Sequence, residues 1–518
     1  MIMKQLMHIF WCVALLLVGF AGCQDKLEEY YVNPETTTQP AIEKFFTHML
    51  NNDRIRPSYW NVRTFLAVHT AKYTQTVGYL NDNNRYQQQL DYTEGRWKDH
   101  YTTGSGIVAQ FREIQKAYDA LSEEEQQDKE VFLQAAKVIY LDQNAKIVDL
   151  WGAIPYTEAG ALPLNGEITP PAFDDAQAIY GDILTGLSEA ADYFANVSLS
   201  EVSSATFKKQ DIALEGDLEK WERYANSLRL RLLMRTSMQD EAGAQSAIMD
   251  MLNNPDAYPL ADVAEYNVLV DPLETYTEDL RNALTEVFAN VAPAYMLETV
   301  MNPVNDPRIP AMFDEGVNGY TAMPLDLNST QQQEGVVADE YAMYDSATFL
   351  FNSDLPGIIM TSSEVNFLKA EAQLRWGSPA EAAAAYNMAL EQSIAFYYQL
   401  NSVGSYRDPL EAPTGEEITV FLANPEVQLT GSTEEMLAKV WTQKWLDFGF
   451  LQSTEGWAEM RRTNYPQLTF EADESAPLFR LPPSRLVYPN LEQTYNTKNY
   501  AQVADSDVRD GKVFWDIN

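Results

Sequence analysis

The chain has 518 residues, more than the ~250–300 over which one hydrophobic core keeps growing, so its fold must use several domains or stacked repeats. A hydrophobic content of 46% and an aromatic content of 12% exclude an intrinsically disordered chain. A formal net charge of -39 provides no basic surface for phosphate backbones, so we expect no nucleic-acid partner.

The N-terminal segment is typical of an exported lipoprotein. An apolar run, Ile9–Phe20, is shorter than the ~20 residues that span a bilayer. Two small residues then precede Cys23, in a pattern that resembles the cleavage motif of the lipoprotein signal peptidase. We therefore predict a signal peptide over residues 1–22, a lipid on Cys23 and a polar tether over residues 23–40. The alternative for Cys23, an unpaired reactive thiol, agrees less well with its position after an apolar run.

Helical patterns dominate the region that follows. Two long runs, Glu94–Leu121 and Lys129–Leu150, are joined by the polar connection Ser122–Asp128, which suits an antiparallel helix pair. In Leu218–Met238 apolar residues recur every three or four positions and form one stripe along a helix. The segment Ala370–Leu390 has the small and aromatic residues of a degenerate tetratricopeptide repeat, which must stack on neighbours to bury its apolar face. We expect a mainly α fold built as a tetratricopeptide-like helical repeat scaffold.

The periodicity changes in the middle of the chain. Between residues 253 and 361 prolines recur and long helical patterns disappear, which predicts a loop-rich insertion. We therefore expect one domain, residues 41–518, with helical repeats in 41–252, the insertion in 253–361, and a repeat with a C-terminal part in 362–518. Such an insertion either displays binding groups on a rigid scaffold or only packs against it, and the sequence favours neither interpretation.

Groups for catalysis or metal binding are scarce. The histidines are His8, His48, His69 and His100, and His8 belongs to the predicted signal peptide. A zinc site needs three or four nitrogen or sulfur ligands close together, and no serine lies in the nucleophile elbow that accompanies a serine triad. We expect no catalytic residue, no metal and no cofactor. The 75 acidic residues nevertheless make chance carboxylate pairs, of the kind glycosidases use, unavoidable.

The candidate ligand-binding residues lie in a stretch rich in aromatic side chains, nine of which fall between Tyr59 and Tyr101. Sugar rings stack on such faces, while amide and charged groups bind their hydroxyls. We predict a site formed by Tyr59, Trp60, Tyr79, Asn81, Asp82, Asn83, Arg85 and Tyr86, with a second wall formed by Tyr320, Tyr341 and Tyr344 of the insertion. The alternative is that residues 81–84 only cap a helix and the tyrosines pack on the surface.

Stretches spread over nearly the whole chain match one family in order and spacing. They are DLWGAIPYTEA (Asp149–Ala159), WERYANSLRLRLLMR (Trp221–Arg235), DPR (Asp306–Arg308), SSEVNFLKAEA (Ser362–Ala372), EGWAEMRRTNYP (Glu455–Pro466), RLPPSRLVYPNLEQTYN (Arg480–Asn496) and VFWDIN (Val513–Asn518). Together they resemble the SusD/RagB nutrient-binding lipoproteins of bacterial outer membranes, in particular the SusD-like branch.

That resemblance implies a helical scaffold that packs against a TonB-dependent transporter barrel, captures an oligosaccharide or a peptide, and delivers it inward without breaking a bond. We therefore expect a lipid-anchored protein of the outer membrane, on the cell surface, whose cargo is an oligosaccharide. The alternatives are an oligopeptide cargo, a tetratricopeptide-type scaffold that binds only proteins, and a surface glycosidase. We expect the motif arginines Arg229, Arg231, Arg461 and Arg462 to support the fold, with stems on aromatic rings and heads on backbone carbonyls.

Overall fold

The computed structural model describes residues 41–102, 106–166, 169–272 and 280–518. The predicted signal peptide, the lipidation site Cys23 and the tether lie outside these described residues. Residues 42–518 group into one unit by their backbone contacts. None of the helices in the described part of the chain combines the length and the apolar character of a membrane span.

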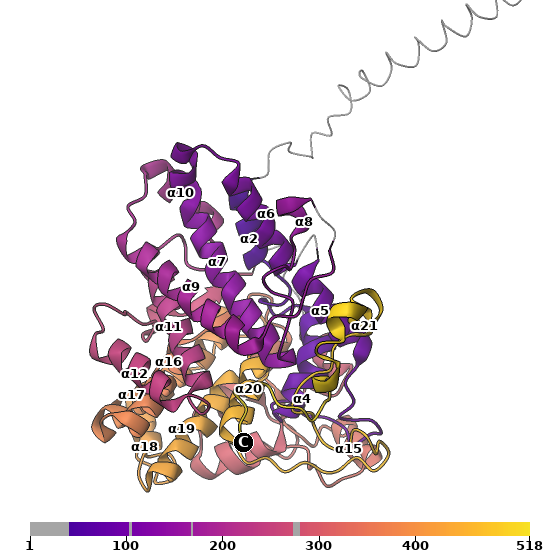
Figure 1. Cartoon of the computed structure of the whole chain (residues 1–518). Helices are drawn as coiled ribbons and strands as arrows, with labels where there is room; N and C mark the ends of the chain where they lie inside the picture. The colour runs from indigo at the N-terminus through magenta and orange to yellow at the C-terminus, as the bar shows by residue number, and fades with distance from the viewer. Residues whose placement is uncertain (1–40, 103–105, 167–168, 273–279) are drawn as a thin grey trace, which may run out of the picture. The chain divides into compact units, whose positions relative to one another are not determined.

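The long helix α7 (Glu123–Trp151) organises the N-terminal half (Figure 1). It packs against α2 (Ile42–Leu50), α6 (Ile107–Asp119) and α9 (Ala176–Asn196), and α11 (Leu218–Thr236) packs in turn on α9. Because α7 has neighbours on several sides, most of its residues from Val131 onward are buried. The other helices of this half are α3 (Tyr59–Asn61), η1 (Val62–Thr70, π-helical), α4 (Ala71–Tyr73), α5 (Leu90–Tyr101), α8 (Leu162–Asn165), α10 (Glu201–Gln210) and α12 (Glu241–Asn253).

The polar connection predicted between the first two helical runs is instead the start of α7. The Ser122 hydroxyl accepts a hydrogen bond from the Glu125 N–H (3.4 Å), and the Glu125 carboxylate accepts one from the Ser122 N–H (3.0 Å). This reciprocal capping box satisfies backbone donors that a helix start would otherwise leave unpaired. The predicted run Glu94–Leu121 is also two helices, because the backbone becomes extended at Thr102 (ψ 160°) after α5.

The C-terminal part contains the predicted repeat. Helices α16 (Ser362–Trp376) and α17 (Pro379–Val403) pack together along their length, joined by a two-residue turn. Ala370, Ala382 and Ala389 are fully buried, which allows the two backbones to approach closely. The helical repeat predicted here is confirmed. The remaining helices are α18 (Gly415–Leu422), α19 (Thr433–Phe448), α20 (Ser453–Thr463), α21 (Asn490–Tyr495), α22 (Thr497–Tyr500) and η7 (Ala504–Ser506).

All strands within the described ranges lie between residues 253 and 361. Strand β1 (Val268–Val270) pairs antiparallel with β4 (Gly357–Met360), and β2 (Phe313–Asp314) pairs antiparallel with β3 (Met343–Tyr344). The first pair joins the two ends of this segment, so the chain leaves and re-enters the helical scaffold at one place. Its helical turns are η2 (Ala264–Tyr266), α13 (Leu280–Thr285), η4 (Tyr295–Met301), η5 (Asn302–Val304), α14 (Ile309–Met312), α15 (Ser329–Val337) and η6 (Ser346–Leu350).

Charged side chains from four of the motif stretches meet in the core. Arg235 donates to Glu455 (2.8 Å) and to Glu459 (3.0 Å), and it also pairs with Asp149. A buried cation is costly unless an opposite charge compensates it, so these residues stabilise the fold only when they come together. We call the set the motif ion network; its members are Asp149, Arg231, Arg235, Glu364, Glu371, Lys444, Glu455, Glu459 and Arg462.

The predicted role of the motif arginines is confirmed for Arg461. Its guanidinium lies 4.0 Å from the Trp457 ring and donates to the backbone carbonyls of Ser484 (3.0 Å) and Asp149 (2.8 Å). Arg229 lies 5.7 Å from the Tyr258 ring, but its head bonds the side chain of Asn226 (3.3 Å).

For Arg231 and Arg462 the prediction that backbone carbonyls are the main partners is wrong, because both guanidinium groups pair with carboxylates. Arg231 pairs with Glu364 at 2.6 Å and reaches only one carbonyl, that of Ile359 (3.0 Å). Arg462 pairs with Glu371 at 2.7 Å. Both guanidinium groups are buried in the core, where neutral carbonyls cannot compensate a full positive charge.

Candidate functional site

The predicted segment Gly78–Gln89 forms a loop whose two tyrosines point inward. Tyr79 is 3% exposed and Tyr86 is fully buried, and their rings meet edge to face at 6.3 Å. The Tyr86 hydroxyl donates to the Glu471 carbonyl at 3.1 Å. These two rings therefore support the loop from beneath and present no face to a ligand in this structure.

The polar residues of the loop divide into anchors and exposed groups. The Asn81 N–H donates to the Gln332 side chain (2.7 Å), and Arg85 donates to the Asn81 side chain (2.5 Å). Asp82 and Asn83 are exposed to solvent. The loop is thus fixed to the segment that contains α15, and only its tip offers free hydrogen-bonding groups.

A partly buried lysine lies below the loop. The Lys72 ammonium donates to the Arg85 carbonyl at 3.2 Å and lies 5.8 Å from the Tyr79 ring. Burial lowers the pKa of Lys72 to about 8, and the nearby Asp82 carboxylate opposes that shift. Lys72 therefore keeps most of its charge at neutral pH and gives the loop a positive base.

The three tyrosines predicted for the second wall are also mostly buried. Tyr344 is fully buried, and its hydroxyl donates to the Thr76 carbonyl. Tyr341 is 6% exposed and packs in a small cluster with Leu80 of the predicted loop. Tyr320 is half-buried. The structure thus brings the segment 320–344 against the loop, as a second wall requires, but through buried contacts in place of exposed rings.

Trp60 remains as an exposed candidate, with the half-buried Tyr59 beside it. Trp60 is 61% exposed, and its ring meets that of Tyr59 edge to face at 5.1 Å. The Tyr59 hydroxyl donates to the Glu286 carboxylate (2.6 Å), which also accepts from Arg63 (3.1 Å). Ser58 caps the short helix α3 by accepting from the Asn61 N–H (3.2 Å). Trp60 is therefore held at the surface by fixed neighbours.

A second aromatic pair, in which one ring is exposed, was not predicted from the sequence. The rings of Phe351 and Tyr406 stack at 4.5 Å with 7° between their planes, and Tyr406 is 52% exposed. Helix α13 packs against both α3, which carries Tyr59 and Trp60, and η6, which precedes Phe351. We call these four residues the aromatic face. No local signal in the sequence marks Tyr406, because its partner lies 55 positions earlier in the chain.

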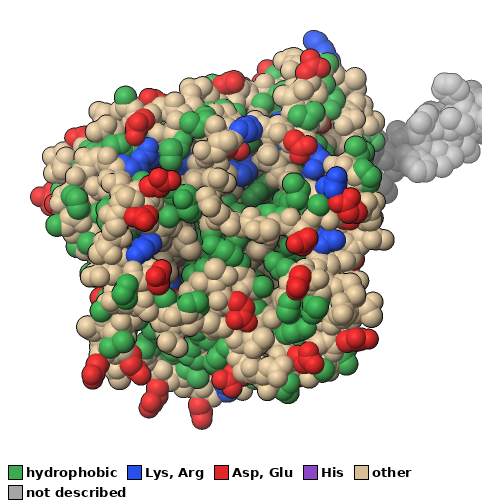
Figure 2. Space-filling model, turned by 90° about the horizontal axis from the view of Figure 1, so that it is seen from below, with side chains coloured by type: hydrophobic (Ala, Val, Ile, Leu, Met, Phe, Trp, Pro, Cys, Tyr) green, Lys and Arg blue, Asp and Glu red, His purple; other side chains and the backbone are tan. Residues whose placement is uncertain are grey.

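One side of the folded unit is hollowed. Figure 2 shows this side, which lies below in Figure 1, with hydrophobic side chains around the hollow, Lys and Arg side chains beside it and acidic side chains spread over the rest of the face. An apolar floor with polar groups around it is typical of sites that bind small molecules.

Two of the histidines, His69 and His100, lie in the interior of the fold. Burial lowers the pKa of both His69 and His100 to about 3, so each stays neutral at physiological pH. His69 accepts from the Gln89 N–H (3.0 Å), and His100 contacts the Asn144 side chain (3.1 Å). Within the described ranges no three His, Cys, Asp or Glu side chains are grouped to hold a metal ion.

Comparison with known proteins identifies the family to which the chain is similar. Residues 29–489 match the SusD-like family model described as starch-binding and associating with the outer membrane. No curated protein sequence matches the chain.

Solved structures share the fold. A chitin-binding protein superimposes with a TM-score of 0.74 and 20% identity, over 92% of this chain and 100% of its own. A chitin-binding SusD homologue from Flavobacterium johnsoniae gives a TM-score of 0.71 and 18% identity, over 92% and 99%. A SusD homologue from Bacteroides thetaiotaomicron gives 0.68 and 23%, over 93% and 100%. The mainly α, tetratricopeptide-like fold expected from the sequence is therefore confirmed.

Proposed function

Because the chain belongs to the SusD-like family, whose members bind nutrients at the outer membrane, we propose that it captures an oligosaccharide at the cell surface and delivers it to a partner TonB-dependent transporter. The observation that carries the proposal is the family match over residues 29–489. A lipid on Cys23 would hold the protein at the membrane, since two or more acyl chains anchor a protein firmly.

The aromatic face supports a glycan as the cargo. Trp60 and Tyr406 present exposed rings, and the C–H faces of sugars stack on such rings while nearby polar groups bind hydroxyls. Arg63 and Glu286 lie beside Tyr59 and supply such polar groups. Two of the similar solved structures carry the description chitin-binding, which agrees with a glycan cargo. An oligopeptide is the alternative, because peptides also bind aromatic and polar surfaces.

We further propose that the protein binds without catalysis. Family members are binding proteins, and the two histidines near the predicted loop are buried and neutral. Incubation with labelled oligosaccharides, followed by separation of products, tests this point, and release of shorter glycans would identify a glycosidase.

Titration calorimetry with starch oligosaccharides, chitin oligosaccharides and a peptide pool tests the cargo. We expect binding to one glycan class, and Trp60→Ala to weaken it at least about fivefold, because truncating a central aromatic contact costs about 1 kcal/mol or more. Tyr495→Ala is the matched control, since Tyr495 is 79% exposed and lies outside the aromatic face. Binding of peptides alone, or equal affinity in Trp60→Ala and wild type, would contradict the proposed glycan site.

The anchor is tested separately. Cells fed labelled palmitate should incorporate it into the wild-type chain and not into Cys23→Ala, and the variant should leave the membrane fraction. A labelled Cys23→Ala chain would refute attachment at that residue.

A further inference from the structure

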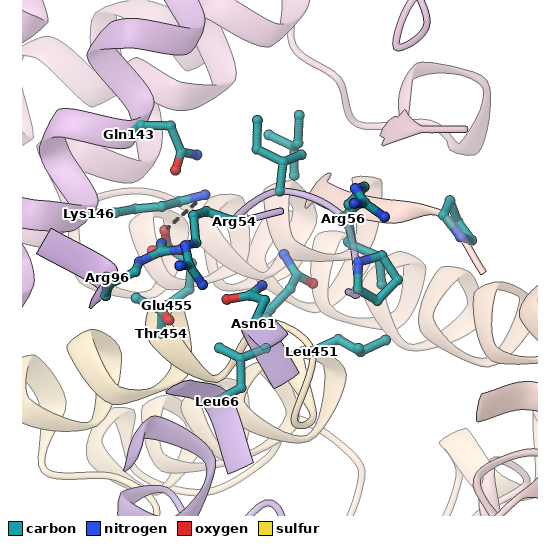
Figure 3. Close-up of a pocket in the computed structure, with 16 residues that line it drawn as sticks. Arg54, Arg56, Asn61, Leu66, Arg96, Gln143, Lys146, Leu451, Thr454 and Glu455 are labelled. Atoms are coloured by element: carbon teal, nitrogen blue, oxygen red, sulfur yellow. Dashed lines mark ion pairs between the residues drawn. The ribbon is translucent and has the colours of Figure 1, made fainter. Parts of the chain in front are cut away.

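A polar cavity lies between α5, α7, α20 and the turn that follows α2 (Figure 3). Its walls include Arg54, Asn61, Arg96, Lys146, Thr454 and Glu455. Figure 3 shows the side chains of Arg54, Arg96 and Lys146 gathered at one end of the cavity. Three basic side chains that share one buried space raise the question of what balances their charge.

Arg96 is a buried cation with no carboxylate partner in the described part of the chain. It is 5% exposed, and its guanidinium lies 5.1 Å from the Phe65 ring. Its Nε and Nη1 have no hydrogen-bond partner among the described residues. Burial lowers the pKa of Arg96 well below its ordinary value, and the charge of Arg54 lowers it further. Because arginine does not lose its proton in proteins, the charge persists and needs a counter-ion.

Arg54 adds a second cation to the same end of the cavity. One of its terminal nitrogens pairs with Asp99, but its Nε and Nη1 have no partner among the described residues. Burial lowers the pKa of Arg54 to about 10. Arg54, Arg96 and Asp99 together carry a net charge of +1, and two neighbouring cations repel each other unless an anion lies between them.

The other carboxylates near the cavity are committed to other partners. Asp53, whose charge acts on Arg54, pairs with Arg56. Glu455 lines the cavity, but it accepts from Arg235 at 2.8 Å and lies 3.6 Å from Arg231 and 3.9 Å from Lys146. Lys146 pairs with Asp142 at 3.1 Å. Nε and Nη1 of both Arg54 and Arg96, together with Gln452 Nε2, therefore line the cavity as donors without a partner among the described residues.

We propose that this cavity binds a small oxyanion group, a carboxylate, sulfate or phosphate, between the guanidinium groups of Arg54 and Arg96. Charge-assisted bonds from guanidinium to an oxyanion are about twice as strong as neutral ones. The volume of the cavity is about 50 Å³. A single water needs only about 10–15 Å³, so the oxygens of one such group can be accommodated. The occupant is either a free inorganic ion or the acidic group of a captured ligand.

Thermal unfolding of the purified full chain tests the site. Sodium sulfate, sodium phosphate and a glucuronate-containing oligosaccharide are titrated separately, with sodium chloride keeping the ionic strength constant. We expect a saturable rise of about 3 °C in Tm with at least one of the three, because a ligand that binds only the folded state stabilises it. Arg96→Met should abolish the rise, and it should not lower the Tm measured without oxyanion, since it replaces an uncompensated charge by an apolar side chain of similar length.

Arg480→Met is the control for loss of a positive charge, because Arg480 is an exposed arginine paired with Glu474 outside the cavity. It should keep the full rise in Tm. Should Arg96→Met fail to fold, wild-type crystals soaked with selenate, or with the acid that raised the Tm, show the position of the anion directly.

The outcomes separate the two sources. A rise with sulfate or phosphate that Arg96→Met abolishes identifies a free ion. A rise with the oligosaccharide alone that Arg96→Met abolishes identifies the acidic group of a ligand, and both results support the site. The proposal is overturned if none of the three probes gives a saturable rise, if Arg96→Met retains the rise, or if the soaked acid lies away from Arg54 and Arg96. A rise with the oligosaccharide that Arg96→Met retains reports glycan binding elsewhere, so failure of the cavity site leaves the proposed function intact.

Discussion

Replacing Arg462 by methionine should destabilise the fold strongly, because the residue sits inside the motif ion network. Arg462 is fully buried and donates to both oxygens of Glu371, each at 2.7 Å. It also donates to Glu459 at 2.7 Å. Methionine keeps most of the side-chain volume but removes the charge and every donor.

The magnitude follows from the contacts that survive. Breaking a buried ion pair by removing one partner costs about 3–5 kcal/mol, because the other charge is left uncompensated. After the substitution Glu371 keeps only longer contacts, 3.4 Å to Arg375 and 3.7 Å to Lys444. Lys444 also lies 2.5 Å from Glu459 and is shared between two carboxylates. Since some compensation persists, we expect the lower end of the range, about 3 kcal/mol.

Urea unfolding followed by tryptophan fluorescence and by circular dichroism provides the measurement, and the two transitions must coincide for a free energy to be derived. The matched control is the double variant Arg462→Met with Glu371→Met, which removes both partners. Replacing a buried pair by apolar side chains is often neutral, so the double variant should recover at least half of the loss. A loss below about 1 kcal/mol in the single variant, or no recovery in the double one, would refute the reasoning.

Two further predictions concern acid stability and the packing of the segment 320–344. Burial alone would raise the pKa of Glu455, but Arg231 and Arg235 hold it at about 2, below the ordinary 4.5. The ionised carboxylate therefore contributes about 3 kcal/mol above pH 4.5, and this contribution is lost as the pH falls from 4.5 towards 2. Thermal unfolding between pH 4.5 and pH 2 should show this loss as a falling Tm. In Glu455→Gln the Tm should depend less on pH across the same window. An equally steep fall in the variant would show that Glu455 is not the group responsible. Gly335→Ala would place a Cβ atom only 2.5 Å from the Tyr341 ring. We therefore expect the free energy of unfolding to fall by about 1–3 kcal/mol, which is measured from the lower Tm of the variant. Adding Tyr341→Leu should relieve it, and an undiminished loss in that pair would exclude the clash as its cause.

Local sequence signals predicted the helices of the scaffold better than the connections between them. The apolar stripe of Leu218–Met238 and the small residues of Ala370–Leu390 report contacts between neighbouring helices, and both segments are helical as expected. The start of α7 was assigned to a connection because Ser122–Asp128 is polar, although Ser122 and Glu125 have the spacing of a capping box. Polar connections and helix starts use the same residue types, so composition alone does not distinguish them at Ser122–Asp128.

The candidate site was harder to predict, because exposure depends on distant segments. Tyr86 is buried by a partner 385 positions away, and Tyr344 by one 268 positions away. The pattern around each tyrosine contains no trace of these contacts. Trp60 is exposed, and the tyrosine beside it, Tyr59, bonds Glu286, 227 positions later. Residue type therefore suggests the chemistry of a binding site, while the geometry that selects among the tyrosines is a tertiary property.

The bond between Trp515 and Asp149 has a consequence for how the protein matures. The Trp515 indole donates to the Asp149 carboxylate at 2.8 Å across 366 positions, and both residues are buried. Because synthesis starts at the N-terminus, Asp149 is made 366 residues before the indole that donates to it. The hydrogen bonds of this buried carboxylate therefore cannot be completed until Trp515 has been synthesised.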